Sequence, residues 1–177
     1  MAELVALQLP IPWSSLGFPP IPQLGSMVLL DGDDPAWGWE GAAPALGIAA
    51  VSPVPGDVVT GWTVDHVVLL TPDLGETKVA MADVGAEPRL TMEVKGRSTA
   101  FFRVGTVLEV IASPVRDTVI YGVALAAEEP LETVALRWRS SGFDVTVPEP
   151  AIQPGRRIMS VRGLNAGLAV MSTDRAV

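Results

Sequence analysis

Residues 62–85 read WTVDHVVLLTPDLGETKVAMADVG, and this stretch decides the fold. The run 64–71 is apolar and β-branched and is ended by Pro72, which predicts a largely buried strand. Pro72 and Asp73 then open a helix, because proline is tolerated and acidic residues are favoured in a first helical turn. Helical spacing of apolar residues continues to Gly85, a residue suited to a C-terminal cap. The stretch therefore predicts a strand followed by a helix.

Three further strand-like runs follow this helix, at 89–94, 99–104 and 106–112. The pairs Lys95-Gly96 and Val104-Gly105 between them are typical of hairpin turns. The whole unit is therefore expected to have the element order βαβββ.

The same order of elements is predicted a second time. Residues 119–126 read VIYGVALA, another strand-like run, and a helix follows that ends at Gly142. Gly142 lies 57 positions after Gly85, and Gly122 lies 56 positions after His66. Two weak patterns at nearly one offset indicate an internal βαβββ repeat. Its remaining strands are expected at 143–147, 157–162 and 168–172.

A single βαβββ unit leaves one sheet face uncovered, so two such units are expected to pair. The predicted fold is α+β, with paired βαβββ modules that form an open, cupped, mixed β-barrel. The modules are assigned to residues 62–113 and 118–173, which together make one domain, 62–173. Residues 1–61 are predicted to be a strand-rich N-terminal extension packed on this domain. They are too rich in proline for a long helix before residue 25 and too apolar to stay solvated, which favours two or three short strands with loops.

The composition limits the function classes. The chain has 177 residues, no cysteine, one histidine, and 20 acidic against 12 basic side chains, with a formal charge of −8 and a pI near 4.5. The lack of cysteine removes disulfides, iron–sulfur clusters, thiolate zinc sites and cysteine nucleophiles. The negative charge argues against nucleic acid as a partner. No apolar run reaches the ~18–20 residues of a membrane span, so a globular cytoplasmic protein without a membrane partner is expected.

Six segments of the two modules carry a wider resemblance. DHVVLLTPDL at 65–74, GAEPRL at 85–90, AFFRVG at 100–105 and VLEVI at 107–111 resemble a module of the vicinal oxygen chelate superfamily. That superfamily includes glyoxalase, bleomycin resistance and extradiol dioxygenase proteins. QPGRRI at 153–158 with LAVMS at 168–172 looks like the closing half of the second module in small actinobacterial glyoxalase-like proteins. Three N-terminal pieces, 4–12, 16–18 and 26–31, look like a shortened third module.

The resemblance implies a metal or ligand site in the cupped sheet, with metal ligands on the first and last strands of each module. It places His66 on the first strand and Glu109 on the last strand of the first module. An imidazole and a carboxylate suit a divalent Zn, Fe, Mn, Ni or Co ion, and Glu109 is also the candidate catalytic base. Because Glu109 lies in a run that is expected to be buried, it must be paired, protonated or metal-bound. The resemblance further implies a homodimer and a small organic molecule as the bound partner.

The second module departs from this pattern. Gly122 stands where His66 aligns, and Ala169 stands where Glu109 aligns. Catalytic metal sites usually keep three protein ligands, so His66 and Glu109 alone are an incomplete set. Gln8, on an N-terminal strand, supplies an amide oxygen only if that segment completes the barrel. The alternatives for His66 are a core or rim histidine bonded to Glu109 or to backbone, and a direct contact to an organic ligand.

Strand alternation puts His66 on one face with Val68 and Leu70, and Glu109 on one face with Val107 and Ile111. If both faces point into the cup, His66 and Glu109 meet there. Gly122 and Ala169, opposite them, are expected to leave space where side chains would otherwise stand. A small organic molecule can fill such a space. The sequence therefore predicts a ligand cavity bordered by His66, Glu109, Gly122 and Ala169.

Other side chains are weaker candidates. Phe101 and Phe102 are both candidates for ligand contact, although alternation makes one a core residue and lets the other line the cup. Trp37 and Trp39 lie on one face of an extended segment and either line an aromatic pocket or cover a barrel mouth or subunit seam. The pair Arg156-Arg157 either binds an anion or forms salt bridges with acidic residues.

Three function classes remain open. The first is a small-molecule binding protein of the drug-sequestering kind, or a degenerate enzyme with an incomplete metal site. The second is a metal-dependent lyase, isomerase or dioxygenase, in which the metal polarises a small oxygen-chelating substrate. The third is a structural or interaction protein that kept the fold and lost the site. The loss of both second-module ligands favours the first and third classes, and no cofactor beyond a divalent metal is implied.

Overall fold

The computed structural model describes residues 1–173 and contains two sheets. The larger sheet holds both modules. In the first module, β7 (Trp62–Thr71) is followed by α1 (Leu74–Ala82), β8 (Pro88–Val94), β9 (Arg97–Val104) and β10 (Thr106–Ala112). These strands lie in the order β7-β10-β9-β8, with β7 parallel to β10 and the other neighbours antiparallel. This is the predicted βαβββ order.

The second module repeats the arrangement. It contains β11 (Val119–Ala127), α2 (Leu131–Ser140), β12 (Asp144–Val145), β13 (Glu149–Pro150), β14 (Arg157–Arg162) and β15 (Gly167–Ser172). Strand β11 is parallel to β15, and β15 is antiparallel to β14. The remaining strand of the module is split into two short strands, β12 and β13, which both pair with β14. The predicted α+β fold of paired βαβββ modules is confirmed.

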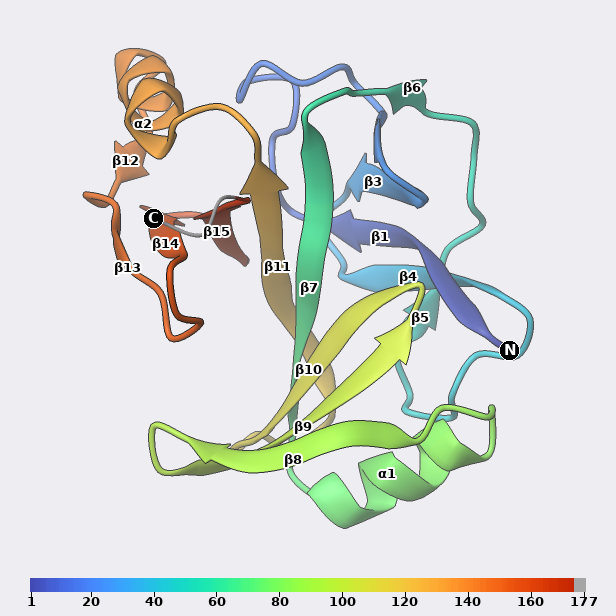
Figure 1. Cartoon of the computed structure of the whole chain (residues 1–177). Helices are drawn as coiled ribbons and strands as arrows, with labels where there is room; N and C mark the ends of the chain where they lie inside the picture. The colour runs from blue at the N-terminus through green and yellow to red at the C-terminus, as the bar shows by residue number, and fades with distance from the viewer. Residues whose placement is uncertain (174–177) are drawn as a thin grey trace.

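The two modules join through their first strands. Strands β7 and β11 are antiparallel neighbours and run side by side through the middle of the molecule (Figure 1). Helix α1 begins at Leu74, so Pro72 and Asp73 lie just before it and not in its first turn as expected. The Asp73 side chain accepts a hydrogen bond from the Glu76 backbone N–H at 3.0 Å, which is the usual N-cap contact. Gly85 and Gly142 follow the two helices with φ of 81° and 92°, a conformation that favours glycine.

Residues 3–58 form a separate six-stranded sheet. Its strands are β1 (Glu3–Leu9), β2 (Pro22–Leu24), β3 (Met27–Asp31), β4 (Ala36–Glu40), β5 (Ala49–Ala50) and β6 (Asp57–Val58), in the order β5-β4-β1-β3-β2-β6. The expectation of two or three strands was too low, because β5 and β6 are exposed two-residue edge strands with no apolar pattern. Strand β1 is parallel to β3, as β7 is to β10 in the first module. Strand β3 is antiparallel to β2, as β10 is to β9. We propose on this basis that the segment is a shortened module without its helix.

One face of the module sheet is buried and the other is half-buried. Val67, Phe102 and Leu108 lie in the core, whereas the alternating residues His66 and Glu109 stay partly accessible. The N-terminal segment covers part of the buried face: the Phe18 ring packs edge-on against Trp62 at 5.0 Å, and the Trp138 indole N–H donates to the Leu16 carbonyl at 2.8 Å. None of the helices within residues 1–173 is both long and apolar enough to cross a bilayer.

Candidate functional site

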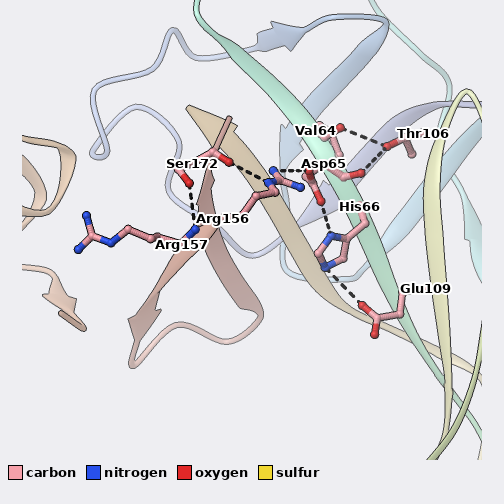
Figure 2. Close-up of polar contacts among 8 residues, drawn as sticks. All are labelled: Val64, Asp65, His66, Thr106, Glu109, Arg156, Arg157 and Ser172. Carbon is pink, nitrogen blue, oxygen red and sulfur yellow. Dashed lines mark hydrogen bonds and ion pairs between the residues drawn. The ribbon is translucent and has the colours of Figure 1, made fainter. Parts of the chain in front are cut away.

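His66 and Glu109 meet on the half-buried face of the sheet. In the β7–β10 ladder, His66 pairs with Val107 and Glu109 pairs with Val68, so both side chains point to the same side. The His66 Nε2 atom lies 3.3 Å from the Glu109 Oε2 atom, and the two side chains are 16% and 15% exposed. Figure 2 shows the contact at the lower end of a chain of four polar residues.

A β-bulge brings Asp65 to the same place. His66 pairs with Ala124 on β11, but Val64 pairs with Leu125, so Asp65 has no partner residue across the ladder. In a regular strand Asp65 and His66 would point to opposite faces, and an extra residue removes that constraint. The Thr106 hydroxyl lies 3.2 Å from the Val64 carbonyl oxygen and 3.4 Å from that of Asp65, which holds the bulge from β10.

Asp65 links His66 to the second module. Its Oδ2 atom is 2.8 Å from His66 Nδ1, and its Oδ1 atom is 2.7 Å from Arg156 Nη2. Arg156 precedes β14, and its Nε–H donates to the Ser172 carbonyl on β15 at 2.9 Å. Arg156, Asp65, His66 and Glu109 therefore form one chain of contacts that crosses from the second module to the first (Figure 2).

The two carboxylates of this chain differ electrostatically. Burial acts to raise the pKa of Asp65, but hydrogen bonds from His66 and Arg156 outweigh it, and the pKa lies below its ordinary value. Burial raises the pKa of Glu109 above its ordinary value; the charge of His66 opposes this rise and the charge of Asp65 adds to it. Asp65 is therefore an ionised acceptor, whereas Glu109 is the carboxyl in this chain that holds a proton more readily.

A cavity of about 610 Å³ lies beside His66, against β7, β11, β14 and β15. Of the four residues expected to border it, His66 and Ala169 line it, and Glu109 and Gly122 do not. His66, Ala124 and Ala169 lie in one row across three strands. Its lining includes the apolar residues Val68, Val123, Ala124 and Leu168 and the polar residues Tyr121, Ser160, Arg162 and Asn165.

Gly122 does not open a space, contrary to expectation. A Cβ atom at this position would overlap the backbone of Gly167, its partner on β15. Gly167 is itself covered by the Tyr121 ring, since a Cβ there would lie 2.6 Å from the ring carbon Cε1. The pair of glycines lets β11 and β15 approach closely. Tyr121, like Asp65, is a bulge residue, because Ile120 and Gly122 pair with the adjacent Leu69 and Val68.

The other candidate side chains lie in different places. Phe101 pairs with Glu109 and shares its half-buried face, whereas Phe102 pairs with Leu108 in the core and is 1% exposed. Phe102 therefore points away from the face that carries His66. Gln8 uses its amide N–H to bind the Asp34 carbonyl at 2.8 Å within the N-terminal segment.

The tryptophan and arginine pairs also have settled contacts. Trp37 and Trp39 pack edge-to-face at 5.2 Å on β4 and are absent from the residues that line the cavity. Arg156 and Arg157 both form salt bridges, Arg156 with Asp65 and Arg157 with Glu132 at 2.6 Å.

The residues at the site do not make a complete metal-binding set. His66 Nε2 and Glu109 Oε2 converge, but no group of three or more His, Cys, Asp or Glu side chains within residues 1–173 could hold a metal ion. Gly122 and Ala169 offer no donor side chain at the equivalent positions of the second module, and Asp65 is committed to Arg156. Two protein ligands fall short of the three that catalytic sites usually keep.

The predicted meeting of His66 with Glu109 is seen in the structure, but the sequence analysis did not predict Asp65 beside them. Strand alternation assigns Asp65 to the opposite face, and only the bulge overturns that assignment. A signal was nevertheless present, because Asp65 is a charged residue inside an apolar strand and needs a partner there. Arg156 had been considered both as an anion ligand and as a salt-bridge residue, and the structure shows it in a salt bridge.

Comparisons with known proteins define the class to which this fold belongs. Methylmalonyl-CoA epimerase from Mycobacterium tuberculosis aligns with a TM-score of 0.51 at 17% identity, over 62% of this chain and 86% of the epimerase. A hypothetical protein from Bacillus halodurans aligns with a TM-score of 0.53 at 14% identity, over 65% of this chain and 96% of its own. A further methylmalonyl-CoA epimerase structure gives a TM-score of 0.50 at 15% identity, over 62% and 93% of the two chains.

These likenesses show a shared fold of paired βαβββ modules. No family model matches the sequence, and no curated protein matches it. At 14–17% identity the alignments show a similar architecture only, and the chemistry of this chain depends on its own residues.

Proposed function

We propose that this chain is a glyoxalase-like small-molecule binding protein that holds its ligand in the cavity beside His66. The observation that carries the proposal is the cavity of about 610 Å³, which spans the junction of the two modules. Ligand sites are typically concave, largely apolar and supplied with a few polar groups, and this cavity has that composition. The incomplete metal set at His66 and Glu109 makes binding the simplest function for it.

The lining favours a small organic molecule with an apolar body. Val68, Val123 and Ala169 offer apolar contacts, and Tyr121 and Ser160 offer hydroxyl groups. The half-buried guanidinium of Arg156 is already paired with Asp65 at 2.7 Å. Arg162 also lines the cavity but is exposed, so the more enclosed part beside His66, Ala124 and Ala169 suits an uncharged, apolar group best.

The second candidate is a metal-dependent lyase, isomerase or dioxygenase. The observation in its favour is the convergence of His66 Nε2 and Glu109 Oε2. If bound, a divalent metal would supply a Lewis acid that polarises substrate oxygens, with His66 and Glu109 as its protein ligands. Elemental analysis of protein purified without chelator distinguishes the two candidates: near-stoichiometric metal that is lost in His66→Ala supports the metal enzyme.

The binding function is tested with an uncharged fluorescent probe, N-phenyl-1-naphthylamine. Titration into the protein is expected to give saturable fluorescence enhancement. Ala169→Phe should fill the cavity and weaken binding at least about tenfold, a loss of about 1.4 kcal/mol. Ala42→Phe makes the same exchange at an exposed position outside the cavity and should leave the titration unchanged.

Two results would contradict the proposal. One is that neither this probe nor any of a panel of small neutral aromatic compounds binds saturably to the folded wild-type protein. The other is equal loss of binding in Ala169→Phe and Ala42→Phe, which would mean that the probe binds elsewhere. Either result would remove the binding proposal and leave the metal enzyme, tested by elemental analysis, and a structural or interaction protein.

A further inference from the structure

We propose that Asp65 and Arg156 form a clamp between the modules that fixes the tautomer and orientation of His66. Asp65 and Arg156 are thus positioning residues, and His66 is the residue they present to the cavity. The tautomer is inferred from the contacts of His66 with Asp65 at 2.8 Å and with Glu109 at 3.3 Å, and only its use in ligand contact rests on the proposed function.

The first step is the protonation of the His66 ring at Nδ1. Asp65 is held by the Arg156 guanidinium at 2.7 Å, so its carboxylate is an acceptor on both oxygens. The Oδ2 atom lies 2.8 Å from His66 Nδ1, and a hydrogen bond between them requires the hydrogen to be on the nitrogen. His66 therefore carries its Nδ1–H toward Asp65.

The second step concerns the other ring nitrogen. The Nε2 atom is 3.3 Å from Glu109 Oε2, against 2.8 Å for Nδ1 and Asp65, so the shorter contact decides where the hydrogen of the neutral ring lies. Nε2 is then the acceptor nitrogen that His66 can offer to a molecule in the cavity it lines. The partner on one ring nitrogen sets the role of the other, as is general for functional histidines. The clamp thus decides which atom of His66 meets the ligand.

The third step is the origin of the clamp. Asp65 reaches His66 because it is the bulge residue on β7, and Arg156 reaches Asp65 from the segment before β14. The Arg156 Nε–H is held by the Ser172 carbonyl on β15, so the guanidinium is fixed at two points. The orientation of His66 on the first module therefore depends on a residue of the second.

The test exploits the single histidine of the chain. Protein labelled with ¹⁵N-histidine gives one Nδ1 and one Nε2 signal, whose chemical shifts report which nitrogen carries the hydrogen in the neutral ring. The wild-type protein is expected to show the Nδ1–H tautomer. In Asp65→Asn the amide can donate to Nδ1 while Glu109 accepts from Nε2, so the signals should change to the Nε2–H tautomer. In Arg156→Gln the carboxylate is no longer fixed, and signals averaged between the tautomers are expected.

Arg157→Gln is the matched control, because the side chain of this neighbouring arginine pairs instead with Glu132 and with the Pro148 carbonyl. It should leave both signals at their wild-type positions. The clamp is refuted if the wild-type neutral ring has the Nε2–H tautomer, or if Arg156→Gln and Arg157→Gln give the same spectrum. Arg156→Gln keeps the test open should Asp65→Asn fail to fold. If the ¹⁵N signals confirm the clamp but the protein binds no probe, the proposed function is wrong and the clamp still stands.

Discussion

At the scale of single residues, the site depends on two half-buried carboxylates, Asp65 and Glu109, and the basic side chains beside them. Asp65 contacts both His66 and Arg156, whereas Glu109 contacts His66 alone among the charged side chains at ion-pair distance in the described structure. This difference keeps Asp65 ionised and makes ionisation of Glu109 more costly. The consequence is that the two pKa shifts change the free energy of unfolding in opposite directions as the pH falls.

Asp65→Asn should destabilise the protein in a pH-dependent manner. The pKa of Asp65 is lowered on folding, so its contribution is fully present above the ordinary carboxyl value and is lost as pH falls through the lower native value. At about pH 7 the substitution should cost ~1–3 kcal/mol, the usual range for a hydrogen-bonded charged group. The cost should shrink steadily when urea unfolding is repeated below about pH 4.

The control for this experiment is Asp117→Asn, at a side chain that is 81% exposed. Its effect at about pH 7 should stay within ~0.5 kcal/mol of zero, as for surface substitutions in general. If the loss of unfolding free energy in Asp65→Asn stayed constant with pH, the charge of Asp65 would not contribute to stability.

At this scale the sequence predicted the pairing of His66 with Glu109 because strand alternation is a local rule. It missed Asp65 because a bulge depends on the register between β7 and β11, and Leu125 and Ala124 look equally apolar in either register. Gly122 was misjudged for a related reason. A glycine marks either an open space or a close approach, and only the position of Gly167 decides between them.

At the scale of elements, the junction of β11 with β15 depends on two facing glycines. Gly122→Ala should destabilise the protein by ~1–3 kcal/mol or more, because the new methyl group would collide with the backbone of Gly167. Urea unfolding followed by circular dichroism measures the effect. Gly75→Ala, on α1, is the control: its methyl group would lie 3.2 Å from the Asp73 carboxylate rather than against backbone, so its effect should stay within ~1 kcal/mol of zero.

A Gly122→Ala protein as stable as the wild type would mean that β15 moves away at little cost. The cavity would then change shape, since Ala169 lies on the same strand. The element pattern itself was predictable from sequence, because apolar runs, helix caps and turn glycines act locally. The split of one strand into β12 and β13 was not, since two-residue strands leave no periodic pattern.

At the scale of the whole molecule, the N-terminal sheet and the modules share one hydrophobic core. Phe18 stands between them, with ring contacts to Trp13, Trp62 and Trp138 at 6.0, 5.0 and 6.4 Å. The Trp-rich N-terminus predicted that this segment packs on the modules, but its strand order depends on pairings over long sequence distances. Such pairings leave little trace in local sequence.

Phe18→Ala should destabilise the whole molecule rather than release one part of it. A cost of ~3–5 kcal/mol is expected from the removal of a buried aromatic ring. Tryptophan fluorescence and far-ultraviolet circular dichroism should give coincident urea transitions in both proteins, with the variant shifted to lower urea. Separate transitions for the two probes would show that residues 1–61 unfold independently.

Self-association is also a property of the whole molecule. The homodimer implied by the family resemblance remains a prediction, and β8 is an exposed edge strand on which Leu90 and Met92 are 52% and 42% exposed. Sedimentation equilibrium at micromolar concentration should give twice the chain mass of 18.6 kDa. A single species of 18.6 kDa would refute the dimer.

The claim that small molecules bind beside His66 is tested most directly by the ¹⁵N signals of that histidine during a titration with N-phenyl-1-naphthylamine. In the wild-type protein both ring-nitrogen signals should shift in a saturable manner, with Nε2 shifting more because Nδ1 is held by Asp65. In Ala169→Phe, which fills the cavity, the same additions should leave both signals in place. Saturable binding of the probe to the wild-type protein with no change at His66 would contradict the claim.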